Sequence, residues 1–141
     1  MSRCAGNLEK LIVEEGPDTI AAFFAEPVMG AGGVLVPPAT YFEKIQAVLR
    51  KHDVLFLVDE VICGFGRTGN LFACETFDLR PDAMTLAKQL SPAYVPISAV
   101  LISDEIYQVV AGEGERRGMF AHGFTSSGHP VASAVALRTL E

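Results

Sequence analysis

The sequence predicts an α/β fold: a parallel or mostly parallel sheet with helices on both faces. One observation is that short, almost wholly apolar runs, which suit strands buried on both faces, recur at 19–28, 54–58, 81–87 and 96–102. A second is that segments with helical spacing of apolar residues lie between or beside these runs. A third is the composition: half of the 141 residues are hydrophobic and 20% are charged, as in a globular core-forming chain.

Two helices are predicted in the first third of the chain. Residues 1–15 keep an apolar period near 3.6, and Gly16-Pro17-Asp18 ends the pattern. A second helix is predicted at about 40–52, after the glycine loop 29–33. Its inner face would consist of Tyr41, Phe42, Ile45, Val48 and Leu49.

Two further helices are predicted later in the chain. Asp104 can N-cap a helix that extends to about residue 111, and the charged, glycine-rich segment 112–118 is expected to be exposed. The Ala/Val/Leu-rich stretch from Pro130 also has helical spacing. Because this pattern is still running at Glu141, we expect the chain to be truncated within a helix.

Charge and cysteine content exclude several classes of protein. The net charge of −6 argues against nucleic acid and anionic membranes as partners. No run of 18 uncharged apolar residues and no signal-peptide pattern occurs in the sequence. The 3 cysteines form no CxxC pair, so neither a disulfide framework nor a zinc site is expected. We therefore expect a reduced, cytoplasmic protein without a bound metal.

Two charged residues stand where apolar strands end. Asp59 follows the run 54–58, and Lys88 follows the run 81–87. Ligands of parallel sheets bind beyond the carboxyl ends of the strands, which directs attention to both residues. If the extended geometry continues past Asp59, Val61 would offer an apolar surface on the same side. A carboxylate and an amine so placed suit pyridoxal phosphate (PLP), whose ring nitrogen pairs with an acid and whose aldehyde reacts with an amine.

The segment Gly64–Gly69 matches the pattern G-x-G-x-x-G and suggests an alternative function. It would make the chain a nucleotide-binding dehydrogenase domain. A dinucleotide fingerprint opens a helix directly and has an acid about 20 residues further on. Here the acids precede the loop, and the residue at the later position is Lys88. The glycines are therefore interpreted as shaping a tight loop near a ligand.

The run LFLVDEVICGFGRTGNLFACETFDLRPDAMTLAKQL, residues 55–90, resembles the signature of class III (omega-type) PLP-dependent aminotransferases of fold type I. The resemblance extends to AEPVMGAGGVLVPPATYF at 25–42 and HGFTSSGHPVASAVAL at 122–137. It is greatest to the omega-amino acid and amine:pyruvate transaminases. It implies that residues 1–141 are the central part of the PLP-binding large domain, about a third of an aminotransferase, without its N-terminal part and its small C-terminal domain.

The resemblance implies roles for five residues. Asp59 matches the aspartate that keeps the pyridine nitrogen protonated, and Val61 matches the apolar residue against the ring. Lys88 matches the catalytic lysine that holds PLP as a Schiff base and then moves the substrate proton. Thr125, with Phe124, matches the segment that reaches the partner's cofactor phosphate across a homodimer interface.

Other positions carry less information about the function. Glu26 matches the glutamate of the family's EP motif, to which we assign no chemistry. Departures at Gln89, Pro92 and Ser126 weaken inference about the substrate but not about the cofactor. His122 and His129 are expected to be structural or capping residues, and Arg67 is expected to form an ion pair with a nearby acid. His52 is expected at a helix end.

The implied activity is ping-pong transfer of an amino group from an amine or omega-amino acid to a keto acid such as pyruvate. The isolated chain is expected to be inactive, and a non-catalytic fragment is the remaining alternative.

Overall fold

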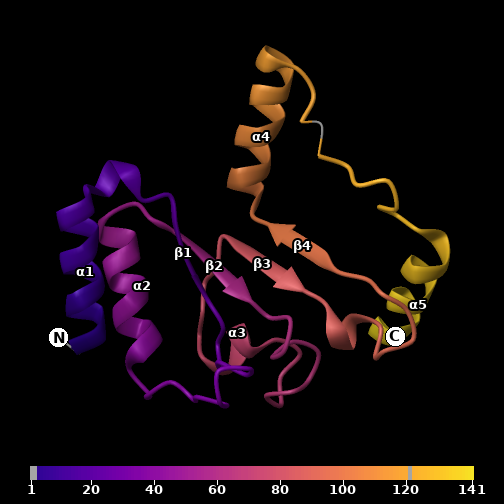
Figure 1. Cartoon of the computed structure of the whole chain (residues 1–141), viewed down its shortest axis with the longest axis horizontal. Coiled ribbons are helices and arrows are strands. Elements are labelled where there is room, and N and C mark those ends of the chain that lie inside the picture. The colour runs from indigo at the N-terminus through magenta and orange to yellow at the C-terminus, as the bar shows by residue number, and fades with distance from the viewer. Residues whose placement is uncertain (1–2, 121) are drawn as a thin grey trace.

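The computed structural model describes residues 3–120 and 122–141, in which helices flank a four-stranded sheet (Figure 1). The main helices are α1 (Arg3–Glu15), α2 (Tyr41–Lys51), α4 (Asp104–Arg117) and α5 (Pro130–Leu140), with a short α3 (Ala73–Thr76). Single 3₁₀ turns occur at η1 (Pro17–Thr19) and η2 (Lys88–Leu90). The strands are β1 (Ala22–Ala25), β2 (Leu55–Asp59), β3 (Ala83–Leu86) and β4 (Ala99–Ile102). Across the described ranges, each helix is too short or too polar to cross a membrane.

The strands lie side by side in the order β1-β2-β3-β4. Strands β1, β2 and β3 are parallel, with Phe23 opposite Phe56 and Asp59 opposite Thr85. The fourth strand pairs antiparallel to β3. The prediction of a mostly parallel α/β sheet is therefore confirmed. Strands β1, β3 and β4 lie within their apolar runs and are shorter than them, whereas β2 has the length of its run but begins one residue later and includes Asp59.

One face of the sheet carries the hydrophobic core. The predicted inner face of α2 packs against β2, and α1 packs against α2 from outside. Buried residues of this layer come from both helices and the strand: Ile12, Phe42, Ile45, Val48, Leu49, Phe56 and Val58. The opposite face is more open, since Phe24 of β1 is 55% exposed. Asp59 shares that second face because it alternates with Val58 along β2.

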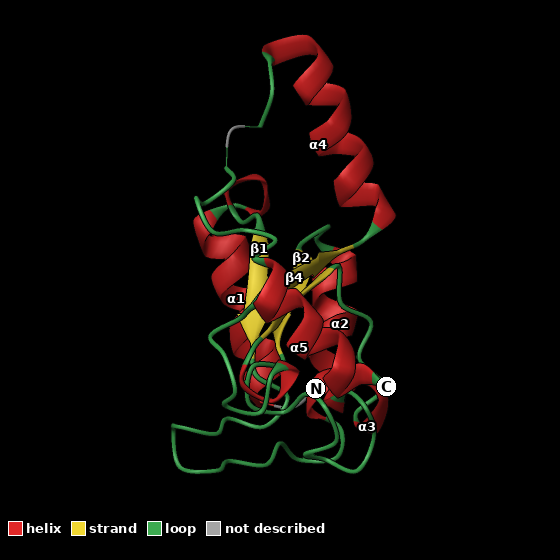
Figure 2. Ribbon diagram, turned by 90° about the vertical axis from the view of Figure 1, so that its right-hand side faces the viewer, coloured by secondary structure: helices red, strands yellow, loops and turns green. Residues whose placement is uncertain are grey.

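Helix α4 differs from its prediction at both ends. Its N-cap is Ser103, whose Oγ accepts a hydrogen bond from the Ile106 N–H at 3.3 Å, so Asp104 is the first helical residue and not the cap. The helix continues to Arg117, beyond the predicted end near 111. Ion pairs from Glu113 to Arg116 and Arg117 stabilise this last part, which contains two glycines and stays largely exposed. Figure 2 shows α4 projecting away from the sheet.

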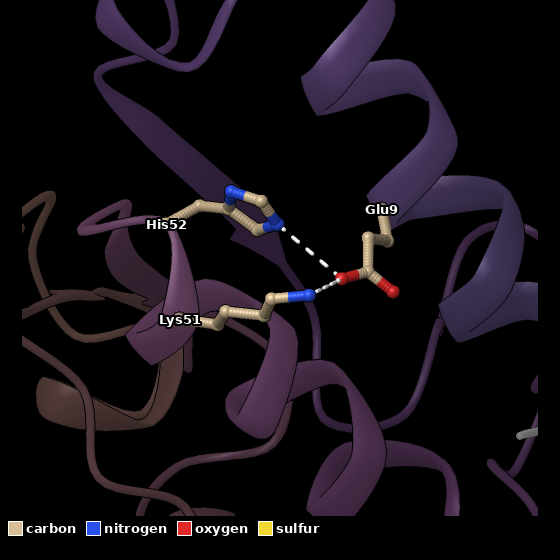
Figure 3. A network of polar contacts seen from close by, with 3 residues as sticks. All are labelled: Glu9, Lys51 and His52. Atoms are coloured by element: carbon tan, nitrogen blue, oxygen red, sulfur yellow. Dashed lines mark hydrogen bonds and ion pairs between the residues drawn. The ribbon is translucent and has the colours of Figure 1, made fainter.

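A polar contact joins α1 to the end of α2 (Figure 3). Glu9 Oε1 lies 2.5 Å from Lys51 Nζ and 3.4 Å from His52 Nε2. His52 is the C-cap of α2, at the helix end predicted for it. Hydrogen bonds from Lys51 first and His52 second lower the pKa of the Glu9 carboxyl. This contact links α1 to the C-terminal end of α2 through polar side chains.

Candidate active site

Asp59 ends β2, and one of its oxygens is fully engaged. Its Oδ1 accepts hydrogen bonds from the Val61 N–H at 2.9 Å and from the Thr85 hydroxyl at 3.1 Å. Within residues 3–120 and 122–141, no hydrogen bond reaches Oδ2. The carboxylate is therefore held in one orientation from two sides, with its second oxygen left for a ligand.

Lys88 lies two residues after the end of β3, at the start of η2, and is exposed. Since β2 and β3 are neighbouring parallel strands, their carboxyl ends lie at the same edge of the sheet. The structure therefore brings Asp59 and Lys88 to one edge, as the sequence predicts. Lys88 has a φ of +44°, in the left-handed region that a residue with a Cβ adopts at a cost.

The loop after Asp59 is closed by backbone hydrogen bonds. Gly64 N–H bonds Glu60 O at 2.8 Å, and the amides of Phe65 and Gly66 both bond Leu71 O. The following helix, α3, has only 4 residues and begins after the loop has ended. A dinucleotide fingerprint needs a helix that opens inside the glycine loop. The glycines instead form a compact turn, so the dehydrogenase alternative is not favoured.

Glu60 is buried beside this loop, with no exposed surface. Its Oε1 accepts a hydrogen bond from the Cys74 N–H at 2.7 Å, while its Oε2 has no partner among the described residues. Burial, and after it the Glu60 carboxyl, raise the pKa of the Cys74 thiol. Burial also raises the pKa of the Cys63 thiol. Glu60 thus anchors α3 to the end of β2, while Asp59 faces Thr85.

A cavity of about 530 Å³ lies beside the carboxyl end of β1. Asp59 and Glu26 contribute carboxylates to its wall, and the other lining side chains are mainly apolar. Glu26 Oε2 accepts a hydrogen bond from the Gly30 N–H at 2.9 Å, which holds the glycine loop after β1. Volumes of this size are typical of small-molecule sites.

The segment that contains Phe124 and Thr125 lies before α5 and is exposed. The Phe124 ring meets the His122 ring edge-on with centroids 4.6 Å apart. In the part of the chain that the structure describes, no hydrogen bond joins Phe124 or Thr125 to Asp59 or Lys88. Their link to the site is indirect, because α5 packs against η2, which begins at Lys88.

Two further sequence predictions have clear outcomes. His129 is a capping residue: its Nδ1 accepts a hydrogen bond from the Ala132 N–H at 3.4 Å at the start of α5. The ion pair expected for Arg67 was wrong, because its side chain points into solvent from the loop and pairs with no acid in the described ranges. No cluster of three or more possible metal ligands occurs in those ranges.

Two site residues escaped the sequence reasoning. Thr85 is the only polar residue within β3, and that position was a signal that its hydroxyl had a specific partner. Ser91, whose N–H bonds Lys88 O, is 3% exposed. No pattern in the sequence distinguishes it from other serines in loops.

Comparison with known proteins decides the family. A family model described as aminotransferase class-III matches residues 1–141. The chain belongs to the class III aminotransferases. Proteins of this class use pyridoxal phosphate as their cofactor, and the solved relatives have the fold-type-I architecture that the sequence predicts.

Among curated class III relatives, gamma aminobutyrate transaminase 2 of Solanum lycopersicum is 60% identical over 140 residues, covering 99% of this chain and 31% of the relative. Vanillin aminotransferase of Capsicum frutescens is 58% identical, covering 99% of this chain and 30% of the relative. The chain thus spans about a third of their length.

Solved class III structures share its backbone closely. A transaminase with L-Ala superposes with a TM-score of 0.97 at 60% identity, covering 99% of this chain and 33% of that one. The omega transaminase from Pseudomonas jessenii in complex with PMP gives a TM-score of 0.96 at 58% identity, covering 98% and 30%.

The residues of this class III chain fit the cofactor. PLP needs an anion for its ring nitrogen and an amine for its aldehyde. Asp59 offers an oriented carboxylate with Oδ2 free of hydrogen bonds among the described residues, and Lys88 offers an exposed amine at the end of the adjacent strand.

Proposed function

We propose that this chain is the central part of the PLP-binding large domain of a transaminase. The whole enzyme would transfer an amino group from an amine or omega-amino acid to a keto acid such as pyruvate. The observation that carries the proposal is the placement of Asp59 and Lys88 at the ends of neighbouring parallel strands in a class III chain. The name of one relative, a gamma aminobutyrate transaminase, supports an omega-amino acid as donor. The name of another, a vanillin aminotransferase, supports a carbonyl compound as acceptor, because vanillin is an aldehyde.

When bound, the cofactor supplies an electron sink for the bond that breaks at the substrate carbon. Asp59 would hold a proton at the ring nitrogen through its Oδ2. The two hydrogen bonds on Oδ1 fix the carboxylate plane before the cofactor arrives, so little reorganisation is needed. Val61 would add an apolar surface beside that anion and keep water from it.

Lys88 would act through its Nζ. The amine would hold the cofactor through its aldehyde, with loss of water. Freed from it, the same amine would take and return a proton at the substrate carbon as general base and general acid. Exposure of the side chain at the sheet edge leaves room for this exchange.

The Thr125 hydroxyl, next to Phe124, would donate a hydrogen bond to the cofactor phosphate of the partner subunit in a homodimer. Support comes from the exposure of this segment, which leaves the hydroxyl accessible to a partner subunit. We further propose a cytoplasmic enzyme, because its 3 cysteines suggest no disulfide framework. Its acidic charge supports the absence of a nucleic-acid or membrane partner. Some relatives are named as mitochondrial or chloroplastic proteins, so location is to be measured.

The test uses a chimera in which this chain replaces the matching segment of the Pseudomonas jessenii omega transaminase. The chimera should bind PLP, and borohydride reduction followed by mass spectrometry should place the cofactor on Lys88. Lys88→Arg keeps the charge but removes the reactive amine, so it should abolish both the covalent product and amino transfer.

The matched control is Lys10→Ala, which removes an exposed lysine of α1. It should leave trapping and amino transfer unchanged. A chimera in which the reduced cofactor appears on another lysine, or in which Lys88→Arg still traps cofactor, would overturn the role of Lys88.

A further inference from the structure

The backbone of Lys88 is held in an unfavourable conformation. Its φ of +44° lies in the left-handed region, where the Cβ of an ordinary residue crowds the backbone. Such a conformation persists only where the surrounding structure imposes it, and it sets the direction in which the side chain leaves the main chain. The residues that impose it therefore control where the Lys88 amine lies.

The turn after Lys88 supplies the first restraint. Leu90 N–H bonds Ala87 O at 3.0 Å, and Ser91 N–H bonds Lys88 O at 3.1 Å. The second bond fixes the peptide plane that follows Lys88. Leu90 is 6% exposed and Ser91 is 3% exposed, so both residues lie in the interior, although Lys88 itself is exposed.

Ser91 uses all of its polar groups to close this turn. Its hydroxyl donates to Val95 O at 2.5 Å, and its carbonyl accepts from the Tyr94 N–H at 2.8 Å. Together with the bond to Lys88 O, these contacts tie both sides of the segment 88–95 to one buried residue. The Ser91 backbone makes the bonds to Lys88 and Tyr94, and its hydroxyl makes the bond to Val95 that closes the far side of the segment. The hydroxyl is the one element of this set that a substitution can remove without touching the backbone.

Helix α5 restrains the same turn from outside. It packs against η2, and its own buried residues are the small Ala132 and Ala136, which allow close approach. The turn is therefore confined between its internal hydrogen bonds and a helix. Loss of the Ser91 hydroxyl would remove one of the internal hydrogen bonds and leave the packing against α5 in place.

We propose that Ser91 is a positioning residue for Lys88: its buried hydroxyl locks the turn that holds Lys88 in the left-handed conformation and so aims the amine at the cofactor aldehyde. This inference rests on the proposed function of Lys88. A role confined to stability would lower the amount of folded protein but would not change how efficiently bound cofactor reaches the amine.

The test measures, in the chimera, the fraction of bound PLP that borohydride fixes to Lys88. Ser91→Ala should lower this fraction about fivefold, the size expected when one hydrogen bond is lost. It should also move the pH midpoint of the absorbance of covalently bound cofactor. Ser91→Cys keeps a weak donor at the same place, so its fraction should fall between those of Ser91→Ala and the parent.

Ser98→Ala is the matched control, because Ser98 lies in the same connection, is exposed and makes no hydrogen bond within the described ranges. It should leave the trapped fraction and the pH midpoint unchanged. If Ser91→Ala does not fold, Ser91→Cys alone decides. A trapped fraction equal to the parent's in the folded variant would overturn the inference. Absence of any covalent cofactor in the parent chimera would instead refute the proposed function.

Discussion

The Thr85 hydroxyl lies 3.1 Å from Asp59 Oδ1, across a pair of residues that face each other in neighbouring parallel strands. Because of this contact, the orientation of the Asp59 carboxylate depends on the register between β2 and β3. A one-residue shift between β2 and β3 would place Thr85 on the other face and release the acid.

Replacing Thr85 by Val should therefore weaken the site without changing its shape. Valine keeps the branched volume in the strand but removes the donor to Asp59. We expect the rate of amino transfer by the chimera to fall about tenfold, as for loss of a hydrogen bond to a charged group. Steady-state kinetics with an amine and pyruvate measure this. Thr85→Ser retains the hydroxyl, and equal losses in the two variants would contradict the explanation.

Gly64 and Gly114 form a contrasting pair. A Cβ on Gly64 would come within 2.8 Å of the backbone oxygen of Glu60, whereas a Cβ on Gly114 meets no atom within 4 Å. Gly64→Ala should destabilise the chimera by about 1–3 kcal/mol, a range usual for overpacking. Gly114→Ala lies in the exposed helix α4 and should stabilise it by about 0.5–1 kcal/mol. Urea unfolding compares them, and the same sign of change in both variants would show the local geometry to be wrong.

The contact of Glu9 with Lys51 and His52 should make stability depend on acid pH. The folded pKa of Glu9 lies below its ordinary value of 4.5, so ionised Glu9 stabilises the fold above that value. This contribution is lost as the pH falls through the lowered pKa. The stability difference between the chimera and its Glu9→Gln variant should therefore be larger at neutral pH than at about pH 3.

Unfolding by urea at the two pH values measures that difference. Glu14→Gln is the matched control, because Glu14 pairs with Lys10 on the open surface of the same helix, where both side chains are more than half exposed. A Glu9→Gln variant whose deficit is the same at both pH values would contradict the prediction.

The three cysteines should differ in reactivity. Cys4 is exposed, whereas burial raises the pKa of both Cys63 and Cys74, so these two thiols provide little thiolate. Iodoacetamide at about pH 8 should label Cys4 first, which peptide mass spectrometry detects. Glu60→Gln removes a carboxylate that raises the pKa of both buried thiols, of Cys74 by hydrogen bonding and charge and of Cys63 by charge alone. Labelling of Cys74 should therefore accelerate more than that of Cys63. Rapid labelling of Cys74 in the parent would contradict its burial.

The sequence pattern was sufficient for the main elements of the fold. Apolar periodicity predicted α2 and its inner face, and the apolar runs predicted strands that end at Asp59 and Lys88. The end of α4 was misplaced because glycines lower helix propensity, while ion pairs of Glu113 oppose that effect. The strained φ of Lys88 and the partner of Thr85 were beyond prediction, because both depend on how distant segments pack and on strand register.

The antiparallel direction of β4 separates two regions of the molecule that can change independently. Because Ile102 pairs with Ala83, at the start of β3, α4 leaves the sheet at the end opposite Lys88. After residues 118–120 and 122–129, α5 packs against the turn after Lys88 (Figure 1). Substitutions on the exposed surface of α4 therefore lie beyond the end of the sheet opposite Asp59 and Lys88 of the same chain. Surface residues of α4 can therefore be substituted, in evolution or in laboratory selection, without altering the groups at the other end of the sheet.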